Sequence, residues 1–261
     1  IESFLNALMA KIGARRFNNK AWLAHIHRWK AKYSSYSVHA HATDIDPNEF
    51  LHELSKKVSG NAMVCADVGQ NQMWVAQSFY LSGDKQLLCS SGHGAMGYSL
   101  PAGIGAHFAS PDRQMICVMG DGGIQINLQE LQTISRERIP VKIFVMNNHS
   151  LGMVRGYHEK YFNNRCFGTV EGYSNPDFQR LALAFNIPYT RICAREDFNR
   201  LDCGLDSDRP HLYEVVLSPT TQVVPEPAPR RAVEDQLPLL DREEFNRLFE
   251  LDGSVAKDEK I

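Results

Sequence analysis

The sequence lacks an excess of positive charge, which excludes the electrostatic pattern of a nucleic-acid-binding protein. Its 28 Lys and Arg residues are balanced by 30 Asp and Glu residues, and the formal net charge is −2 at pH 7. Proteins that bind DNA, RNA or anionic membrane surfaces carry a basic excess. We therefore expect neither a nucleic acid nor a membrane among the partners of this chain.

Long apolar runs and a leader pattern are also missing. No uninterrupted apolar stretch approaches the ~18 residues of a membrane-spanning helix, and no charged region followed by an apolar stretch opens the chain. The six cysteines form no C-x-x-C pair and no Cys/His quartet at zinc spacing. Reduced thiols of this kind are typical of the cytoplasm, which is the location we predict.

Short apolar runs alternate with helical patterns over most of the chain, as in proteins with a parallel sheet. We expect an α/β fold with an open, mainly parallel six-stranded sheet and helices on both faces. The expected strands are residues 62–66, 86–89, 114–119, 141–146, 189–192 and 211–217. The clearest intervening helices are expected at residues 124–138 and 175–185.

Three regions differ in pattern and predict three parts. Residues 1–40 are expected to form a helical appendage, residues 41–225 the α/β domain, and residues 226–261 a charged tail that follows a Pro-rich stretch. His39 and His41 could form a two-ligand metal site, but no further ligand lies near them in the sequence. A solvated loop is the better interpretation of this pair.

A glycine-rich turn follows the third expected strand. Residues 114–119 run into Gly120-Asp121-Gly122-Gly123 and then a helix. Glycine lets an anion approach main-chain N–H groups and a helix N-terminus closely. A carboxylate beside an anion would repel it, so Asp121 indicates a cation between the two.

A pair of asparagines follows the next strand, and Asn148 comes 27 positions after Asp121. One helix and a right-handed crossover fill that interval, so the ends of the two strands are expected to lie side by side. An Asp oxygen, an Asn oxygen, a main-chain carbonyl and two phosphate oxygens suit Mg²⁺. The two residues therefore predict a magnesium site that is shared with a phosphorylated ligand.

At these positions the sequence resembles the thiamine diphosphate enzymes, and its motifs are most similar to those of the acetolactate synthase branch. The resemblance covers about residues 60 to 220. It is carried by four motifs in order: residues 67–74 (DVGQNQMW), 91–101 (SGHGAMGYSLP), 120–131 (GDGGIQINLQEL) and 147–154 (NNHSLGMV). The resemblance implies the thiamine diphosphate-binding fold, with thiamine diphosphate and Mg²⁺ as cofactors.

The resemblance implies roles for individual residues of these motifs. Asp121, Asn148 and the main-chain carbonyl of Ser150 would bind Mg²⁺. The other implied cofactor contacts lie in the same motifs. Gln70, Asn71, Gly122 and Gly123 would hold the diphosphate, and Gly120, in the same turn as Gly122 and Gly123, would also contact the cofactor. Gly94 and Met96 would lie against the rings, and Gly152 and Met153 would close over the cofactor.

The implied activity is decarboxylation of a 2-keto acid such as pyruvate and transfer of the two-carbon unit to a keto acceptor. The Glu that activates the cofactor belongs to a separate pyrimidine-binding domain in this family, and no counterpart is found here. The chain would then be the C-terminal third of a longer homodimeric or tetrameric enzyme and would not turn over alone. FAD is a further cofactor that the resemblance allows in the full-length protein.

Several features leave alternatives open. Asn71, His93 and Tyr157 depart from the family pattern around the substrate end. Simple decarboxylation to an aldehyde and a non-catalytic cofactor-binding subunit are two alternatives. A third is a dinucleotide site, since residues 92–97 match G-x-G-x-x-G and Asp121 follows at the interval of a ribose-binding acid. That reading leaves the Asn pair and the glycines around Asp121 without a role.

Overall fold

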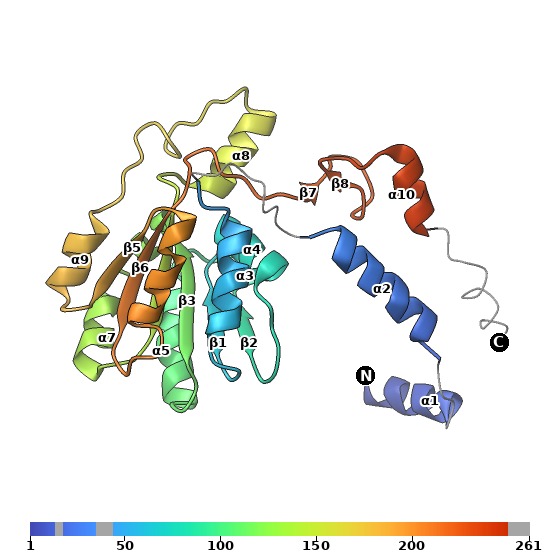
Figure 1. Cartoon of the computed structure of the whole chain (residues 1–261), viewed down its shortest axis with the longest axis horizontal. Helices are drawn as coiled ribbons and strands as arrows, with labels where there is room; N and C mark the ends of the chain where they lie inside the picture. Colours follow the sequence, from blue (N-terminus) through green and yellow to red (C-terminus); the bar gives the residue numbers. More distant parts are fainter. Residues whose placement is uncertain (14–17, 35–43, 250–261) are drawn as a thin grey trace. The chain divides into compact units, whose positions relative to one another are not determined.

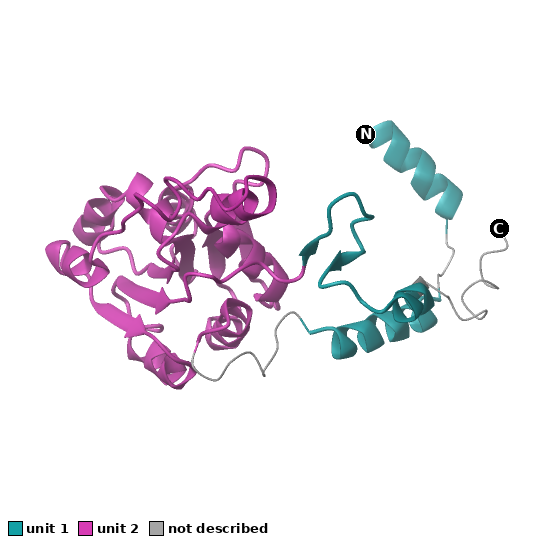
Figure 2. Cartoon of the chain, turned by 90° about the horizontal axis from the view of Figure 1, so that it is seen from above, with its two compact units in different colours: residues 1–34, 226–261 teal, residues 35–225 magenta. Residues whose placement is uncertain are grey.

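The computed structural model describes residues 1–13, 18–34 and 44–249. The chain divides into two compact units (Figure 2). One unit consists of residues 35–225, and the other combines residues 1–34 with residues 226–261. Each unit is described by itself below.

The larger unit contains a six-stranded sheet in which every pair of neighbouring strands is parallel (Figure 1). The strand order is β2-β1-β3-β4-β6-β5. The strands are β1 (Met63–Ala66), β2 (Gln86–Cys89), β3 (Met115–Gly120), β4 (Lys142–Asn147), β5 (Tyr189–Ile192) and β6 (His211–Val216). The predicted α/β class is confirmed, and each strand begins and ends within one residue of its expected bounds.

Hydrophobic side chains pack on both faces of this sheet. Along β3, Ile116 and Val118 belong to one buried cluster, whereas Cys117 and Met119 belong to the other, because successive residues of a strand point to opposite faces. Helices α3 (Pro47–Lys57) and α4 (Gln70–Ser78) contribute to the first cluster. Helices α5 (Ser99–Ala109), α7 (Glu130–Glu137) and α9 (Phe178–Ala184) contribute to the second. Strands buried on both sides read as continuous apolar runs, which explains why they were predictable.

The strand order reverses beside β1. The chain passes from β1 to β2 on one side and then returns to place β3 on the other side of β1. In open α/β sheets the crevice at the carboxyl ends of the strands near such a reversal is where ligands bind. The connections that leave β1, β3 and β4 at this edge lead into α4, α6 (Asp121–Ile126) and α8 (Gly152–Tyr161).

Two expected helices differ in extent from the observed ones, and two elements of the larger unit were not predicted. The helix expected over residues 124–138 is divided between α6 and α7, and the break lies at Asn127, whose Nδ2 donates to the Gly97 carbonyl over 2.8 Å. The helix expected from residue 175 begins only at Phe178, because the Asp177 side chain caps it by accepting from the Arg180 N–H. Helix α8 and the 3₁₀ segment η1 (Arg195–Cys203) were not predicted.

The smaller unit joins segments from the two ends of the described chain. It contains α1 (Glu2–Ile12), α2 (Lys20–Lys32), the antiparallel pair β7 (Glu226–Pro227) and β8 (Gln236–Leu237), and α10 (Arg242–Phe249). Glu244 accepts a hydrogen bond from the Tyr33 hydroxyl over 2.5 Å and pairs with Lys32 over 2.8 Å. Among the helices of the described residues, none combines the length and the apolar character that crossing a bilayer requires.

The close approach of α5 to β3 generates a prediction about stability. A Cβ added at Gly103 would lie 2.4 Å from the buried Cys117 Sγ, whereas one added at Gly105 of the same helix would meet nothing within 4 Å. We expect Gly103→Ala to lower the free energy of unfolding by about 2 kcal/mol through overpacking. Gly105→Ala should raise it by up to about 1 kcal/mol, since alanine favours the helix.

Urea denaturation of the two variants and the wild type measures both effects. Equal stabilities for the two alanine variants would contradict the close packing of α5 on β3.

Candidate functional site

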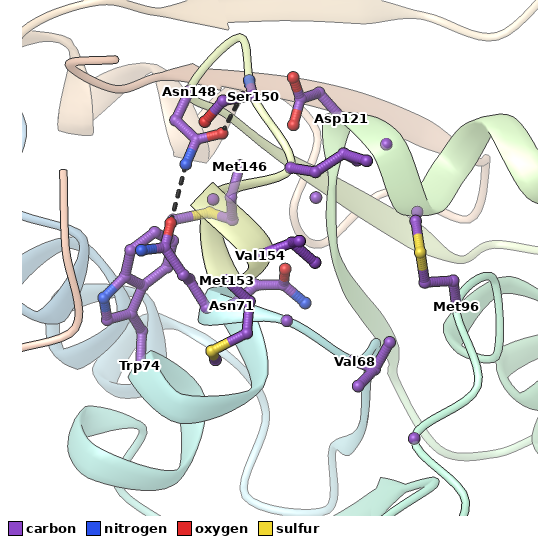
Figure 3. Close-up of a pocket in the computed structure, with 18 residues that line it drawn as sticks. Val68, Asn71, Trp74, Met96, Asp121, Met146, Asn148, Ser150, Met153 and Val154 are labelled. Atoms are coloured by element: carbon purple, nitrogen blue, oxygen red, sulfur yellow. Dashed lines mark hydrogen bonds between the residues drawn. The ribbon is translucent and has the colours of Figure 1, made fainter. Parts of the chain in front are cut away.

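A cavity of about 260 Å³ opens at the carboxyl ends of β1, β3 and β4 in the larger unit (Figure 3). Four chain segments that are distant in the sequence meet around it. Every residue for which a cofactor or metal contact was predicted lines this cavity: Gln70, Asn71, Gly94, Met96, Gly120, Asp121, Gly122, Gly123, Asn148, Ser150, Gly152 and Met153. The strand pairing brings Asp121 and Asn148 together, as their spacing predicted, and the residues implied by the family resemblance lie around the same cavity.

Three helices begin at this cavity. The first residues of α4, α6 and α8 all contribute to its lining, from segments 69–71, 120–123 and 151–154. The first N–H groups of an α-helix have no partner inside the helix and carry partial positive charge. Within the described chain, none of these three N-termini is capped by a side chain. The cavity is therefore suited to an anion with several oxygens, such as a diphosphate.

A buried carboxylate lies among these positive ends. Asp121 is 1% exposed, and its Oδ2 has no hydrogen-bond partner among the described residues. Burial raises the pKa of the Asp121 carboxyl to about 6, against the opposing effects of a hydrogen bond from the Tyr173 hydroxyl and of the nearby His149. An unpaired buried oxygen of this kind is costly unless a proton or a cation satisfies it.

The second half of the predicted metal pair is held by neighbours on both sides. Asn148 donates through Nδ2 to Gln70 Oε1 over 2.9 Å, and its Oδ1 accepts from the Ser150 N–H over 3.3 Å. Figure 3 shows the Asp121 carboxylate and the Asn148 amide on the same side of the cavity, with Ser150 between them in this view. Asp121 and Asn148 follow β3 and β4, which are neighbours in the sheet.

The donor set fits a hard divalent cation that shares its coordination with a ligand. No group of three His, Cys, Asp or Glu side chains gathers as a metal site within the described ranges. A cation beside Asp121 would therefore depend on amide oxygens, main-chain oxygens and the oxygens of a bound phosphate. Mg²⁺ favours this arrangement, because it prefers oxygen ligands and is commonly bound through one or two carboxylates together with phosphates.

The first asparagine of the pair has a different role from the second. Asn147 is the last residue of β4, and its Nδ2 donates to Glu214 Oε1 over 2.7 Å. Its Oδ1 accepts the His149 N–H over 3.1 Å, at a residue whose φ of 53° lies in the left-handed region. Asn147 thus fixes the turn that presents Asn148 and Ser150 to the cavity.

Two motif glycines are required by close contacts. A Cβ at Gly123 would lie 2.1 Å from Asp67 Oδ2, which belongs to a carboxylate that accepts main-chain N–H groups from the loop before α5. A Cβ at Gly152 would lie 2.0 Å from Gln70 Oε1 and 2.6 Å from Asn148 Nδ2. Side chains at these positions would push apart the segments that form the site.

The side-chain amide of Asn71 is bonded to the protein main chain. Its Nδ2 donates to the Asp67 main-chain oxygen over 2.6 Å, and its Oδ1 lies beside Gly69 and Gly120. The side chain thus closes the turn that opens α4. At the N-terminus of this helix, the main-chain N–H of Asn71 is among the groups available to an anion.

Sequence reasoning missed most of the apolar wall of the cavity. The additional lining side chains are Val68, Trp74, Met146, Leu151 and Val154. Most of them lie inside the motifs quoted above, so position within a motif was the available signal. The wall contributes an apolar surface next to the polar helix ends, and the thioethers of Met96 and Met153 extend it.

The dinucleotide interpretation does not fit the observed local structure. That fingerprint needs a glycine-rich turn directly between a strand and a helix. Here β2 ends at Cys89 and α5 begins only at Ser99, so residues 92–97 belong to a longer loop. Asp121 opens α6 instead of ending a second strand. His39 and His41, the other alternative site, lie outside the described residues.

Comparison with known proteins identifies the same region. Residues 67–215 match the family model described as "Thiamine pyrophosphate enzyme, C-terminal TPP binding domain". The chain is 35% identical over 221 residues to an acetolactate synthase large subunit of Cyanidium caldarium, which covers 84% of this chain and 37% of that protein. It is 34% identical over 232 residues to the acetolactate synthase isozyme 2 large subunit of Escherichia coli, covering 86% of this chain and 41% of that protein.

A solved structure agrees with these relatives. The thiamine diphosphate-dependent 4-hydroxybenzoylformate decarboxylase of Rhodococcus jostii RHA1 matches with a TM-score of 0.63 and 26% identity, over 71% of this chain and 35% of that one. The chain thus spans well under half the length of each of these proteins. The fold, the cavity at the strand ends and the match over residues 67–215 show that the chain belongs to the C-terminal thiamine pyrophosphate-binding domain family of the thiamine pyrophosphate enzymes.

Proposed function

We propose that this chain is the diphosphate-binding part of a thiamine diphosphate- and Mg²⁺-dependent enzyme that decarboxylates a 2-keto acid such as pyruvate and transfers the two-carbon unit to a keto acceptor. The observation that carries the proposal is the cavity in which three helix N-termini surround the unpaired carboxylate oxygen of Asp121. Positive helix ends suit a diphosphate, and the carboxylate suits the cation that joins the diphosphate to the protein.

The proposed roles follow from the lining of the cavity. Asp121, Asn148 and the Ser150 carbonyl would bind Mg²⁺, and the N–H groups at the starts of α4, α6 and α8 would bind the diphosphate. Met96 and Met153 are both part of the lining and about 40% exposed, so their thioethers are available to support the rings of the cofactor. The apolar wall would exclude water from that end of the site.

The cofactor would supply the electron sink for decarboxylation when it is bound. The residues of this chain would hold and orient it, and the proton-transferring Glu is proposed to come from a pyrimidine-binding domain of the same or another subunit. The acetolactate synthase relatives and their greater length support this arrangement. We further propose a homodimer or tetramer and, since all six cysteines are free thiols, a reducing compartment such as the cytoplasm.

A second candidate function is simple decarboxylation to an aldehyde. It is favoured by the likeness to the Rhodococcus decarboxylase. Transfer and simple decarboxylation differ in whether the site admits a keto acceptor for the two-carbon unit. Product analysis of the complete enzyme with pyruvate distinguishes an acetohydroxy acid from acetaldehyde.

Binding of the cofactor is the direct test of the proposal. In titration calorimetry, the chain should bind thiamine diphosphate when Mg²⁺ is present and lose this binding when EDTA removes the metal. NAD⁺ should give no heat of binding under either condition. Binding of NAD⁺ without a response to thiamine diphosphate and Mg²⁺ would overturn the proposed function.

Asp121→Asn should weaken cofactor binding and at the same time stabilise the ligand-free chain. The substitution removes the charged metal ligand, so Mg²⁺-dependent binding of thiamine diphosphate should fall at least a hundredfold. The ligand-free variant should nevertheless be more stable than the wild type near pH 7.5, by about 2 to 3 kcal/mol, because the folded-state pKa is raised from 3.8 to about 6. The folded protein holds this proton more tightly than the unfolded chain, so wild-type stability falls as pH rises from about 4 to about 6.

Urea denaturation between about pH 4 and about pH 7.5 measures the free energy of unfolding of both proteins. In the variant this free energy should not fall between about pH 4 and about pH 6. Asp112→Asn is the matched control, since Asp112 is an exposed carboxylate in the loop before β3, at the opposite end of that strand from Asp121. Asp112→Asn should leave both the Mg²⁺-dependent binding of thiamine diphosphate and the free energy of unfolding unchanged. An Asp121→Asn protein that binds as tightly as the wild type would remove the metal assignment.

A further inference from the structure

A closed circuit of hydrogen bonds runs behind the proposed metal site and includes a residue that no motif assigned. Its first half was described above: Gln70 Oε1 accepts from Asn148 Nδ2, and Asn148 Oδ1 accepts from the Ser150 N–H. Its second half depends on Arg155, in the first turn and a half of α8. Arg155 Nη1 donates to Ser150 Oγ over 3.0 Å, and Nη2 donates to the Thr221 carbonyl over 2.5 Å.

The circuit closes at Thr221. The same carbonyl accepts from Gln70 Nε2 over 3.2 Å, so Gln70 and Arg155 meet at one main-chain oxygen. Three separate segments are thereby joined: the start of α4, the loop between β4 and α8, and the segment after β6. Two of these segments, those of Gln70 and of Asn148, carry groups that line the cavity.

The side chains of the circuit are buried, so water cannot substitute for a missing partner without cost. Gln70, Asn148, Ser150 and Arg155 are each at most 5% exposed. Gly152 lies against Gln70 and Asn148 so closely that a Cβ there would meet both. The loop that presents Asn148 and Ser150 is therefore held by specific polar contacts and by close packing.

The chemistry of the guanidinium explains why an arginine suits this place. Its planar fork directs two N–H groups at two acceptors that belong to different segments. Glu159, one turn further along α8, lies 3.3 Å from Arg155 Nε and balances the buried charge, and it also accepts from Gln222 Nε2 over 2.5 Å. The Arg155 guanidinium thus contacts both the loop that presents Ser150 and the Thr221 carbonyl, and its partner Glu159 contacts Gln222.

We propose that Arg155 is a positioning residue for the divalent cation site, which it serves by fixing Ser150 and, through Thr221 and Gln70, Asn148. This inference rests on the proposed function, because it assigns to Arg155 the orientation of two proposed metal ligands. Groups that orient metal ligands without touching the metal contribute strongly to affinity, and their loss typically costs 10- to 100-fold.

The test compares Arg155→Met with the wild type in two measurements on the 261-residue chain. Methionine keeps an unbranched apolar stem and removes the fork. In the presence of thiamine diphosphate, we expect the affinity for Mg²⁺ to fall 10- to 100-fold in calorimetry. In metal-free protein, amide hydrogen exchange should become faster over residues 148–152 and 221–222, while exchange in β3 stays as slow as in the wild type.

Arg136→Met is the matched control, because Arg136 is an exposed arginine of α7 whose side chain pairs with its neighbour Glu137. It should change neither measurement. Arg155→Lys keeps the charge but not the fork and should give an affinity between those of the wild type and the methionine variant.

The outcomes separate the inference from the function on which it rests. Unchanged Mg²⁺ affinity in Arg155→Met, or an increase in exchange that extends equally to β3, would overturn the positioning role. If Arg155→Met does not fold, Ser150→Ala removes only the hydroxyl end of the circuit, and unchanged exchange and affinity in that variant would overturn it equally. A wild-type chain that binds no Mg²⁺ with thiamine diphosphate would contradict the proposed function, whereas the exchange comparison would still decide whether Arg155 orders the loop.

Discussion

The parallel pairing of β3 with β4 is the constraint on which the rest of the site depends. Its register places Ile116 beside Lys142 and Gly120 beside Met146, so the two strands end next to each other at the same edge of the sheet. Asp121 and the Asn147-Asn148 turn then begin from neighbouring points. Because both strands are almost entirely buried, this register is strongly specified, and it fixes where the two halves of the site begin.

The fold was predictable because the four central strands, β1, β3, β4 and β6, are buried on both faces. Their sequences are short continuous apolar runs bounded by turn residues, and such runs identify strands without any knowledge of the contacts they make. The helices were less predictable. The break at Asn127 depends on a hydrogen bond to Gly97, thirty residues earlier, and α8 contains two glycines and exposed Met153, Val154 and Tyr157, so its pattern does not resemble an amphipathic helix.

The candidate site was predictable to the extent that its residues come from local motifs. Asp121 and the glycines around it are recognisable as a strand, a turn and a helix start, and Asn148 was found from its distance along the chain. Arg155 could not be found in this way, because its partner Thr221 is 66 residues away and lies in a segment without a motif. The two asparagines also look equivalent in the sequence, and their different roles appear only in their contacts, with Glu214 and His149 for Asn147 and with Gln70 and Ser150 for Asn148.

The convergence of three helix starts on one carboxylate has a consequence for the stability of the fold. In the described part of the chain, the unpaired N–H groups of α4, α6 and α8 and the buried oxygen of Asp121 lack partners of opposite charge in the same cavity. A ligand that supplies an anion together with a cation therefore satisfies both and stabilises the folded state to which it binds.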